Sequence, residues 1–249
     1  MTEYRRNNII YIVGIGPGNV SMMTEQAVHA LEECDTVVGY PVYLKLVEEL
    51  TEGKNIISTP MKKEVERCRI AYEEAVKGKR VAVISSGDAG IYGMASLMYE
   101  LLPEYPGVEL YVVAGITAAN SGAAVLGAPL SGDFAVISMS DLLTPFELIE
   151  KRLRCAAEAD MVIVLYNPAS HTRKDYLKRA CDIVRDFIPD DRACGYVKNI
   201  GREGEEAVTL SFAELASAEV DMFTTVYIGN SRSFINNNNM VTKRGYSVL

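Results

Sequence analysis

Three short, mainly apolar segments, each followed by a loop of small residues, constrain the fold of this 249-residue chain most strongly. Continuous apolar strands are typical of parallel sheets that helices cover on both faces. Helical patterns at residues 24–33 and 62–77, with a further strand expected at 36–38, lie between the first two segments, and a helix that ends at Leu102 is expected between the second and third. The first 115 residues therefore predict right-handed βαβ units and a mostly parallel sheet. The three apolar segments are residues 9–13, 81–85 and 109–113.

The pattern changes after residue 117, and we expect a domain boundary there. Residues 116–129 are rich in Ala and Gly and predict a packed connector. Two later runs, 207–211 and 224–228, are expected to pair as a hairpin around a helix that starts at Phe212. The other predicted elements are strands at 134–138, 161–166 and 193–197 and helices at 146–157 and 174–187. The chain is thus expected to form two α/β domains, residues 1–117 and 118–249.

Composition excludes several classes of function. The net charge is −8, and the basic residues are dispersed, which disfavours a nucleic-acid partner. The polar start of the chain does not resemble a signal peptide, and no apolar run approaches the ~20 residues that a membrane helix needs. We therefore expect a cytoplasmic protein with no membrane partner. Five scattered cysteines without a CxxC motif, and only His29 and His171, predict neither a disulfide framework nor a metal site.

The loop after the first strand reads Gly14-Ile15-Gly16-Pro17-Gly18. A dinucleotide site requires GxGxxG and an acidic residue at the end of the second strand. Here Pro17 removes an amide donor, and the second strand ends at Gly39-Tyr40. The pattern disfavours a nicotinamide cofactor, and leaves open a tight turn or a loop that faces another ligand.

The second loop, SSGDAGIYG (residues 85–93), and the third, VVAGITAANS (residues 112–121), also follow predicted strands. Asp88 in the second loop is a candidate acceptor for a ligand amine or ribose, and equally a candidate cap for the next helix. Because the carboxyl ends of parallel strands meet at one edge of a sheet, the three loops are expected to converge on one crevice.

These loops, together with four later segments, resemble those of the tetrapyrrole methyltransferases of the cobalamin pathway, and the resemblance covers residues 10–246. Within that family, the combination is similar to the members that methylate carbon 17 of the macrocycle and contract its ring. The later segments are VISMSD (136–141), LYNP (165–168), KNIGREGE (198–205) and TVYIGN (225–230), and RGY (244–246) closes the match.

The resemblance implies a tetrapyrrole methylase fold, in which two α/β domains enclose a cofactor cleft. It implies that S-adenosyl-L-methionine is the cofactor and that the protein forms a homodimer, with no metal. Carried over position by position, it implies cofactor contacts from Pro17, Ser86, Gly87, Asp88, Ile91, Tyr92, Thr117, Ala118, Asn167, Asn199, Ile200 and Thr225.

The implied substrate is a tetrapyrrole of the precorrin-3B or cobalt-factor III type, which carries several carboxylates. An acidic protein must bind it through local cations, and Lys62, Arg202 and Arg244 are the candidates. Ring contraction requires proton transfer, for which Tyr40, Ser85 and Lys198 are candidates, with Asp88, Ser140 and Glu203 further possibilities. Tyr40 stands where the uroporphyrinogen branch of the family has an aspartate. The alternatives are a methyltransferase for carbon 11 or 20, a nicotinamide-dependent reductase, and a non-catalytic binding protein.

Overall fold

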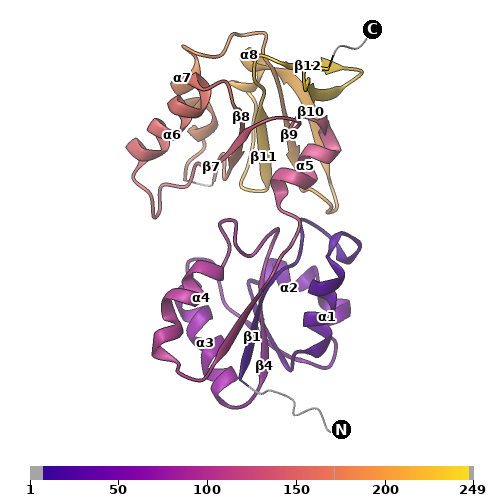
Figure 1. Ribbon diagram of the computed structural model, residues 1–249, viewed down its shortest axis with the longest axis vertical. Helices are drawn as coiled ribbons and strands as arrows, with labels where there is room; N and C mark the ends of the chain where they lie inside the picture. The colour runs from indigo at the N-terminus through magenta and orange to yellow at the C-terminus, as the bar shows by residue number, and fades with distance from the viewer. Residues whose placement is uncertain (1–7, 171, 247–249) are drawn as a thin grey trace. The chain divides into compact units, whose positions relative to one another are not determined.

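The computed structural model of the protein describes residues 8–170 and 172–246. The N-terminal residues 1–7 and His171, which entered the sequence argument, lie outside this range. Contacts within the chain divide it into two compact units, Met1–Thr117 (unit 1) and Ala118–Leu249 (unit 2). Figure 1 shows both units with their elements labelled.

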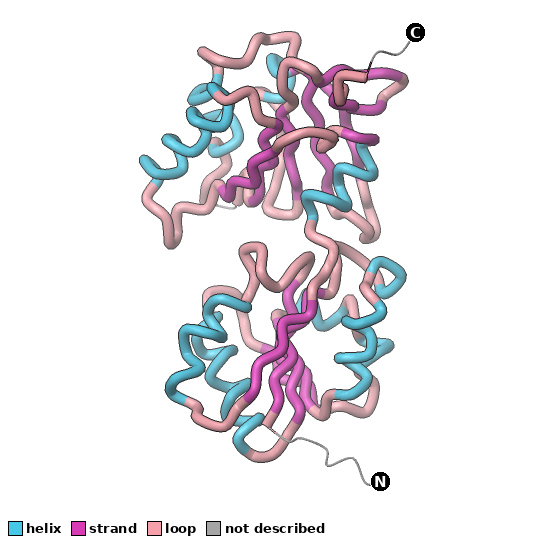
Figure 2. The backbone as a smooth tube through the Cα atoms, in the orientation of Figure 1, coloured by secondary structure: helices cyan, strands magenta, loops and turns pink. Residues whose placement is uncertain are grey.

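Unit 1 is built on a five-stranded sheet in which all the strands are parallel, as predicted. Figure 2 shows these strands in magenta with helices on both sides. The strand order is β3-β2-β4-β1-β5, so the first strand of the chain lies inside the sheet between β4 and β5. The carboxyl ends of all five strands therefore lie at the same edge. The strands are β1 (Ile9–Gly14), β2 (Thr36–Gly39), β3 (Asn55–Ser58), β4 (Arg80–Ser85) and β5 (Glu109–Val113).

Helices cover both faces of this sheet because successive side chains of a strand point to opposite faces. Ile10 and Ile12 of β1 pack with α3 and α4, whereas Val13 packs with α1. The Thr24 side chain accepts a hydrogen bond from the amide of Ala27 and so fixes the start of α1. The helices are α1 (Glu25–Glu33), α2 (Pro41–Lys45), α3 (Glu64–Val76) and α4 (Ala95–Leu101), with single 3₁₀ turns at Val20–Met22, Glu48–Leu50 and Leu102–Glu104.

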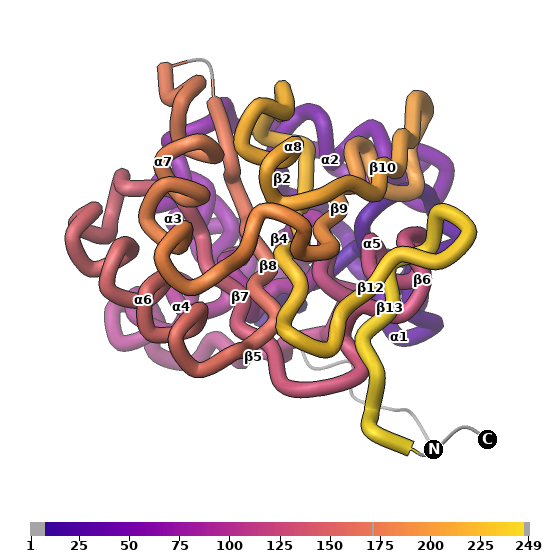
Figure 3. The backbone as a smooth tube through the Cα atoms, turned by 90° about the horizontal axis from the view of Figure 1, so that it is seen from above, coloured from indigo at the N-terminus to yellow at the C-terminus, as the bar shows by residue number. Residues whose placement is uncertain are grey.

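Unit 2 contains a mixed five-stranded sheet of order β10-β9-β11-β8-β7. Only β7 and β8 are parallel, and every other pair is antiparallel. Helices α6, α7 and α8 pack on one face and α5 on the other (Figure 3). The strands are β7 (Phe134–Ser138), β8 (Val162–Tyr166), β9 (Ala193–Lys198), β10 (Glu206–Ser211) and β11 (Thr224–Ile228). The helices are α5 (Ala118–Leu126), α6 (Phe146–Glu158), α7 (Tyr176–Val184) and α8 (Phe212–Leu215).

Two predictions about unit 2 are wrong. The expected connector forms helix α5, because its alanines favour a helix and Gly122 allows close packing against Tyr227. The expected hairpin between β10 and β11 does not form, because both strands pair with β9, one on each side. The buried strand β9 instead makes its hairpin with β10, through a turn at residues 199–205.

A small three-stranded sheet completes unit 2. Strands β12 (Ser233–Asn236) and β13 (Asn239–Thr242) form a hairpin, and β13 also pairs with β6 (Gly127–Ala128). Asn237 and Asn238 make the two-residue turn of this hairpin at φ 48° and 60°, where asparagine is well tolerated. Across residues 8–170 and 172–246, no helix has the length and apolar character required to cross a bilayer.

Candidate functional site

The three glycine-containing loops of unit 1 are joined through their backbones, which confirms the predicted convergence. Gly16 and Gly87 exchange a pair of hydrogen bonds, with N···O distances of 3.0 and 2.7 Å. The amide of Ile15 also donates to the carbonyl of Ser85 at 2.9 Å. These bonds hold the loop after β1 against the loop after β4, beyond the carboxyl ends of the two strands.

The third loop packs against the first two with no room for a side chain. A Cβ atom on Gly115 would lie 2.1 Å from the carbonyl oxygen of Gly87 and 2.6 Å from the carbonyl group of Gly14. A Cβ on Gly14 would lie 2.7 Å from the amide nitrogen of Gly115. Three backbone segments therefore touch at this point, and only glycine permits the contact.

Asp88 connects two of the loops through its carboxylate. Oδ1 accepts hydrogen bonds from the amides of Gly90 at 2.8 Å and Ile91 at 3.1 Å, and Oδ2 accepts from the amide of Gly115 at 3.0 Å. Asp88 does not cap the next helix, because α4 begins only at Ala95. The carboxylate thus bonds to the turn of its own loop and to the loop after β5.

The other predicted cofactor residues of unit 1 lie along the same edge and differ in exposure. Pro17 and Thr117 are buried, and Ser86 is half-buried. Ile91 and Tyr92 are exposed to 39% and 59%, so the second loop presents an apolar surface to solvent. The side chains within this edge are thus small, and the larger ones point outward.

The candidate residues for proton transfer in unit 1 have unequal surroundings. Ser85 is 5% exposed, and its hydroxyl accepts the amide of Met94 at 3.3 Å, which is a structural bond. Tyr40 follows β2, is half-buried and packs edge-on against Tyr43. Within the described part of the chain its hydroxyl has no hydrogen-bond partner. The exposed Lys62 lies after β3, at the same edge of the sheet.

The predicted cofactor residues of unit 2 also gather at one edge of their sheet. Because β8 and β9 run antiparallel to β11, residues that follow β8 or β9 lie beside the start of β11. The hydroxyl of Tyr166 accepts the amide of Ala119 at 2.7 Å, which places the first turn of α5 there too. The edge brings together Ala118, Asn167, Asn199, Ile200 and Thr225.

Two asparagines at this edge have left-handed backbones, with φ 52° at Asn167 and 51° at Asn199. The Asn167 side chain donates to Ser138 Oγ at 3.0 Å, and the Asn199 side chain donates to the carbonyl of Gly204 at 3.3 Å. These bonds fix the turns that end β8 and β9. Thr225 and Ile200 are buried, so their contribution to a ligand site would be mainly through backbone and shape.

The basic candidate residues of unit 2 are partly or fully accessible. Lys198 Nζ lies 2.8 Å from Asp221 Oδ2, and this hydrogen bond raises the pKa of Lys198 above its usual range. The side chain is therefore held as an ammonium, which suits anion binding better than proton acceptance. The guanidinium of Arg202 lies 5.9 Å from the Phe223 ring, and Arg244 is exposed near the chain end.

Sequence reasoning missed a polar cluster that follows β7. The Asp141 carboxylate accepts from Tyr176 at 2.6 Å and from Arg173 at 2.7 Å, and these bonds hold its pKa below the usual range. The following residues Leu142 and Leu143 are exposed to 60% and 99%. Asp141 was visible only as part of the VISMSD segment, and nothing local indicated its distant partners.

A buried arginine was also missed. Arg67 is 5% exposed and donates to Thr59 Oγ1 at 2.7 Å and to the carbonyls of Thr59 and Pro60 at 3.2 and 3.1 Å. It thereby fixes the segment after β3 that leads to Lys62. One signal in the sequence could have revealed its burial: Arg67 stands four residues before Ala71 in a helical pattern, so both lie on the same buried face of the helix.

The family model and the similar proteins all indicate the same family for this chain. The family described as Tetrapyrrole (Corrin/Porphyrin) Methylases matches residues 9–216. A Salmonella typhimurium protein named "Probable cobalt-factor III C(17)-methyltransferase" is 44% identical, over 96% of this chain and 100% of that protein. A Priestia megaterium protein named "Cobalt-factor III methyltransferase" is 45% identical over 95% of this chain, which spans only 45% of that relative's length.

Solved structures agree. The crystal structure of the methyltransferase CobJ matches with a TM-score of 0.87 and 34% identity, over 95% of this chain and 100% of that one. A uroporphyrin-III C-methyltransferase from Thermus thermophilus, complexed with S-adenosyl homocysteine, matches with a TM-score of 0.70 over 88% of this chain and 91% of that one. At 21% identity the second match shows a shared fold.

Proposed function

Because the chain belongs to the tetrapyrrole (corrin/porphyrin) methylase family, we propose that it methylates carbon 17 of a macrocycle of the cobalt-factor III or precorrin-3B type in cobalamin biosynthesis. The names of the relatives that match along nearly the whole chain support this substrate class. S-adenosyl-L-methionine, the proposed methyl donor, would supply an activated methyl group. The observation that carries the proposal is the contact of three glycine loops at one edge of unit 1.

The residues of unit 1 fit an adenosyl ligand. Positions 14, 87 and 115 leave no space for side chains, so a ligand at this edge meets backbone amides and carbonyls directly. Pro17 cannot donate an amide where a pyrophosphate would need one, which fits an adenosyl group better than a dinucleotide. We therefore propose that residues 86–92 and 117 of unit 1 hold the cofactor. The contacts implied for the five residues at the edge of unit 2 stay a prediction from the family resemblance.

The chain's own groups would then position and neutralise the substrate. Methyl transfer from a sulfonium needs the acceptor carbon held within ~3–3.5 Å of the methyl, so orientation is the main task of the protein. Lys62, Lys198, Arg202 and Arg244 are the proposed partners for the macrocycle's carboxylates. For proton transfer we favour Tyr40, because its hydroxyl makes no hydrogen bond within the described residues, whereas that of Ser85 is bonded inside unit 1.

The proposal is tested by calorimetry and by product analysis. S-adenosylhomocysteine should bind in the micromolar range, and NAD should not bind. Incubation with S-adenosylmethionine labelled with carbon-13 in the methyl group and each candidate macrocycle should add one methyl, which NMR should place at carbon 17. Methylation at carbon 11 or 20 would favour another branch of the family, and NAD binding without S-adenosylhomocysteine binding would favour the reductase alternative. We also propose that the protein is a homodimer, which the mass from light scattering tests. A cytoplasmic location is a separate proposal, which cell fractionation tests.

The substrate cations can be tested separately. Replacing Lys198, Arg202 or Arg244 by Met should remove a charge-assisted hydrogen bond and weaken affinity for the macrocycle roughly 10- to 150-fold. Affinity for S-adenosylhomocysteine should not change. Lys178→Met is a matched control, because this lysine is also ion-paired, to Asp182 on α7. If all three variants bind the macrocycle like wild type, the carboxylates bind elsewhere.

A further inference from the structure

The carboxylate of Asp88 is largely occupied by the protein's own backbone. An ionised carboxylate offers about four acceptor positions, and three are filled by the amides of Gly90, Ile91 and Gly115. Two of these bonds are local and close a turn. The third spans 27 residues and joins the loop after β4 to the loop after β5.

This third bond lies at the glycine contact itself. The backbone of Gly115 lies so close to Gly87 that a Cβ atom on Gly115 would be 2.1 Å from the carbonyl oxygen of Gly87. Among residues 8–170 and 172–246, strand β5 is the edge strand of the sheet and pairs only with β1, so its loop has no neighbouring described strand on the outer side. A charged acceptor beside the Gly115 amide therefore adds a strong tie where the sheet provides little support.

The two local bonds have a different effect. They fix the turn at Gly90 and Ile91, which precedes Tyr92 with its left-handed φ of 53°. Ile91 and Tyr92 are exposed to 39% and 59%, so this turn presents apolar side chains outward. One carboxylate thus sets both the shape of the second loop and its distance from the third.

We infer that Asp88 is a positioning residue that holds the second and third loops in register for the adenosyl ligand, and that its carboxylate does not contact the ligand. The inference rests on the proposed function for the identity of the ligand. It replaces the expectation that Asp88 accepts a hydrogen bond from the ligand's amine or ribose. A positioning role predicts that loss of the carboxylate lowers the affinity for every ligand that contacts the two loops, and by the same factor for each.

The test compares two variants against a series of ligands. In Asp88→Asn an amide NH₂ replaces one carboxylate oxygen, so the variant cannot accept from all three amides. In Asp88→Ser the hydroxyl can still close the local turn but is too short to reach Gly115. The ligands are S-adenosylhomocysteine, its 2′-deoxy and 3′-deoxy analogues, and 5′-methylthioadenosine, which lacks the amino-acid part.

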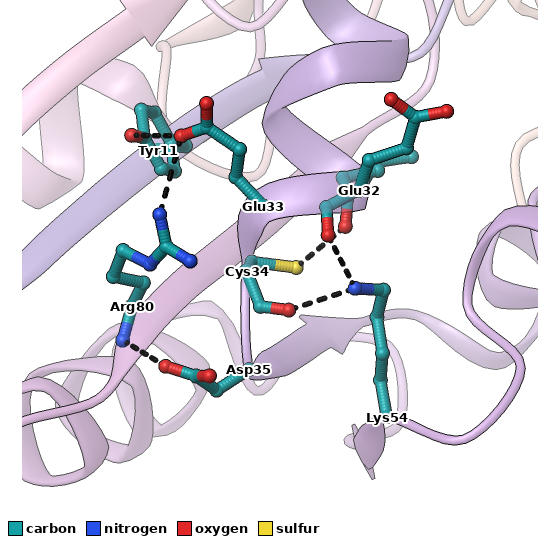
Figure 4. A network of polar contacts seen from close by, with 8 residues as sticks. Tyr11, Glu32, Glu33, Cys34, Asp35, Lys54 and Arg80 are labelled. Atoms are coloured by element: carbon teal, nitrogen blue, oxygen red, sulfur yellow. Dashed lines mark hydrogen bonds and ion pairs between the residues drawn. The ribbon is translucent and has the colours of Figure 1, made fainter.

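Both variants are expected to lose about 10- to 100-fold in affinity, by factors that agree within about threefold across the four ligands. Hydrogen exchange at the Gly115 amide should become faster in both. Asp35→Asn is the matched control, because the Asp35 carboxylate also accepts a distant amide, that of Arg80, at 2.9 Å (Figure 4). That bond lies at the opposite end of the strands, so the control should lose stability but keep its affinity within about twofold.

The outcomes separate this inference from the proposed function. If wild type does not bind S-adenosylhomocysteine, the proposed function fails. Suppose that wild type binds and that Asp88→Asn lowers the affinity for three ligands but not for the fourth, which lacks one particular group. Asp88 then contacts that group directly, and the inference is wrong. Unchanged affinity of Asp88→Ser for all four ligands would also overturn it, because this variant removes the tie to Gly115 and keeps the turn.

Discussion

Substitution of Gly115 by alanine tests the contact of the three loops with the smallest possible perturbation. The new methyl group would lie 2.1 Å from the carbonyl oxygen of Gly87, against an ordinary contact distance that begins at 3.4 Å. The third loop must therefore move by about 1.3 Å, because the three nearest atoms all belong to backbone and cannot rotate away. Gly115 does not have a left-handed φ, so the effect is steric and does not arise from backbone conformation.

The expected cost of this overpacking is about 1–3 kcal/mol of unfolding free energy. For a chain of this size, a loss of about 2 kcal/mol lowers the melting temperature by roughly 4–8 °C. A displacement of about 1 Å at a binding site is expected to reduce ligand binding more than it reduces the stability of the fold. We therefore expect affinity for S-adenosylhomocysteine to fall at least 10-fold while the far-ultraviolet circular dichroism spectrum stays native.

Calorimetry and thermal melting of Gly115→Ala provide the assay, with Gly132→Ala as the control. Gly132 has no heavy atom within 4 Å of an added Cβ and no left-handed φ, so its substitution should change neither quantity measurably. The reasoning is refuted if Gly115→Ala melts and binds like Gly132→Ala. A variant that melts several degrees lower yet keeps full affinity would show that the loop contact is structural and that the ligand lies elsewhere.

Two further predictions concern unit 2. Hydrogen bonds from Tyr176 and Arg173 lower the pKa of Asp141, so its ionised carboxylate adds about 1 kcal/mol to the free energy of unfolding. This contribution is complete above the unfolded pKa of ~3.9 and is lost as pH falls through the lower pKa of the folded state. The difference in denaturant stability between wild type and Asp141→Asn should accordingly shrink below pH 4; a constant difference would contradict this. Tyr227→Phe removes a buried hydroxyl that donates to two carbonyls in the first turn of α5 and should cost about 1–2 kcal/mol, whereas the exposed Tyr99→Phe should cost nothing.

Local pattern was sufficient for the parts of the fold that depend on one segment. The run Ile9–Gly14 is apolar without interruption, and a strand buried on both faces is the structure that accommodates it. The cap of α1 is equally local, because the Thr24 side chain bonds to the amide of Ala27, only three residues along the chain. Pattern failed where structure is short or weakly apolar: β3 has mostly exposed residues, and α2 is only five residues long.

The sequence by itself determined the parallel sheet of unit 1, the three small-residue loops at the ends of its strands and their meeting at one edge. These follow from periodicity and from the geometry of parallel strands, which are encoded within short stretches of chain. The tertiary structure alone decided that β9 lies between β10 and β11, and that the carboxylate of Asp88 reaches Gly115. Strand partners and long-range acceptors depend on which surfaces pack together, and no local pattern of residues records that choice.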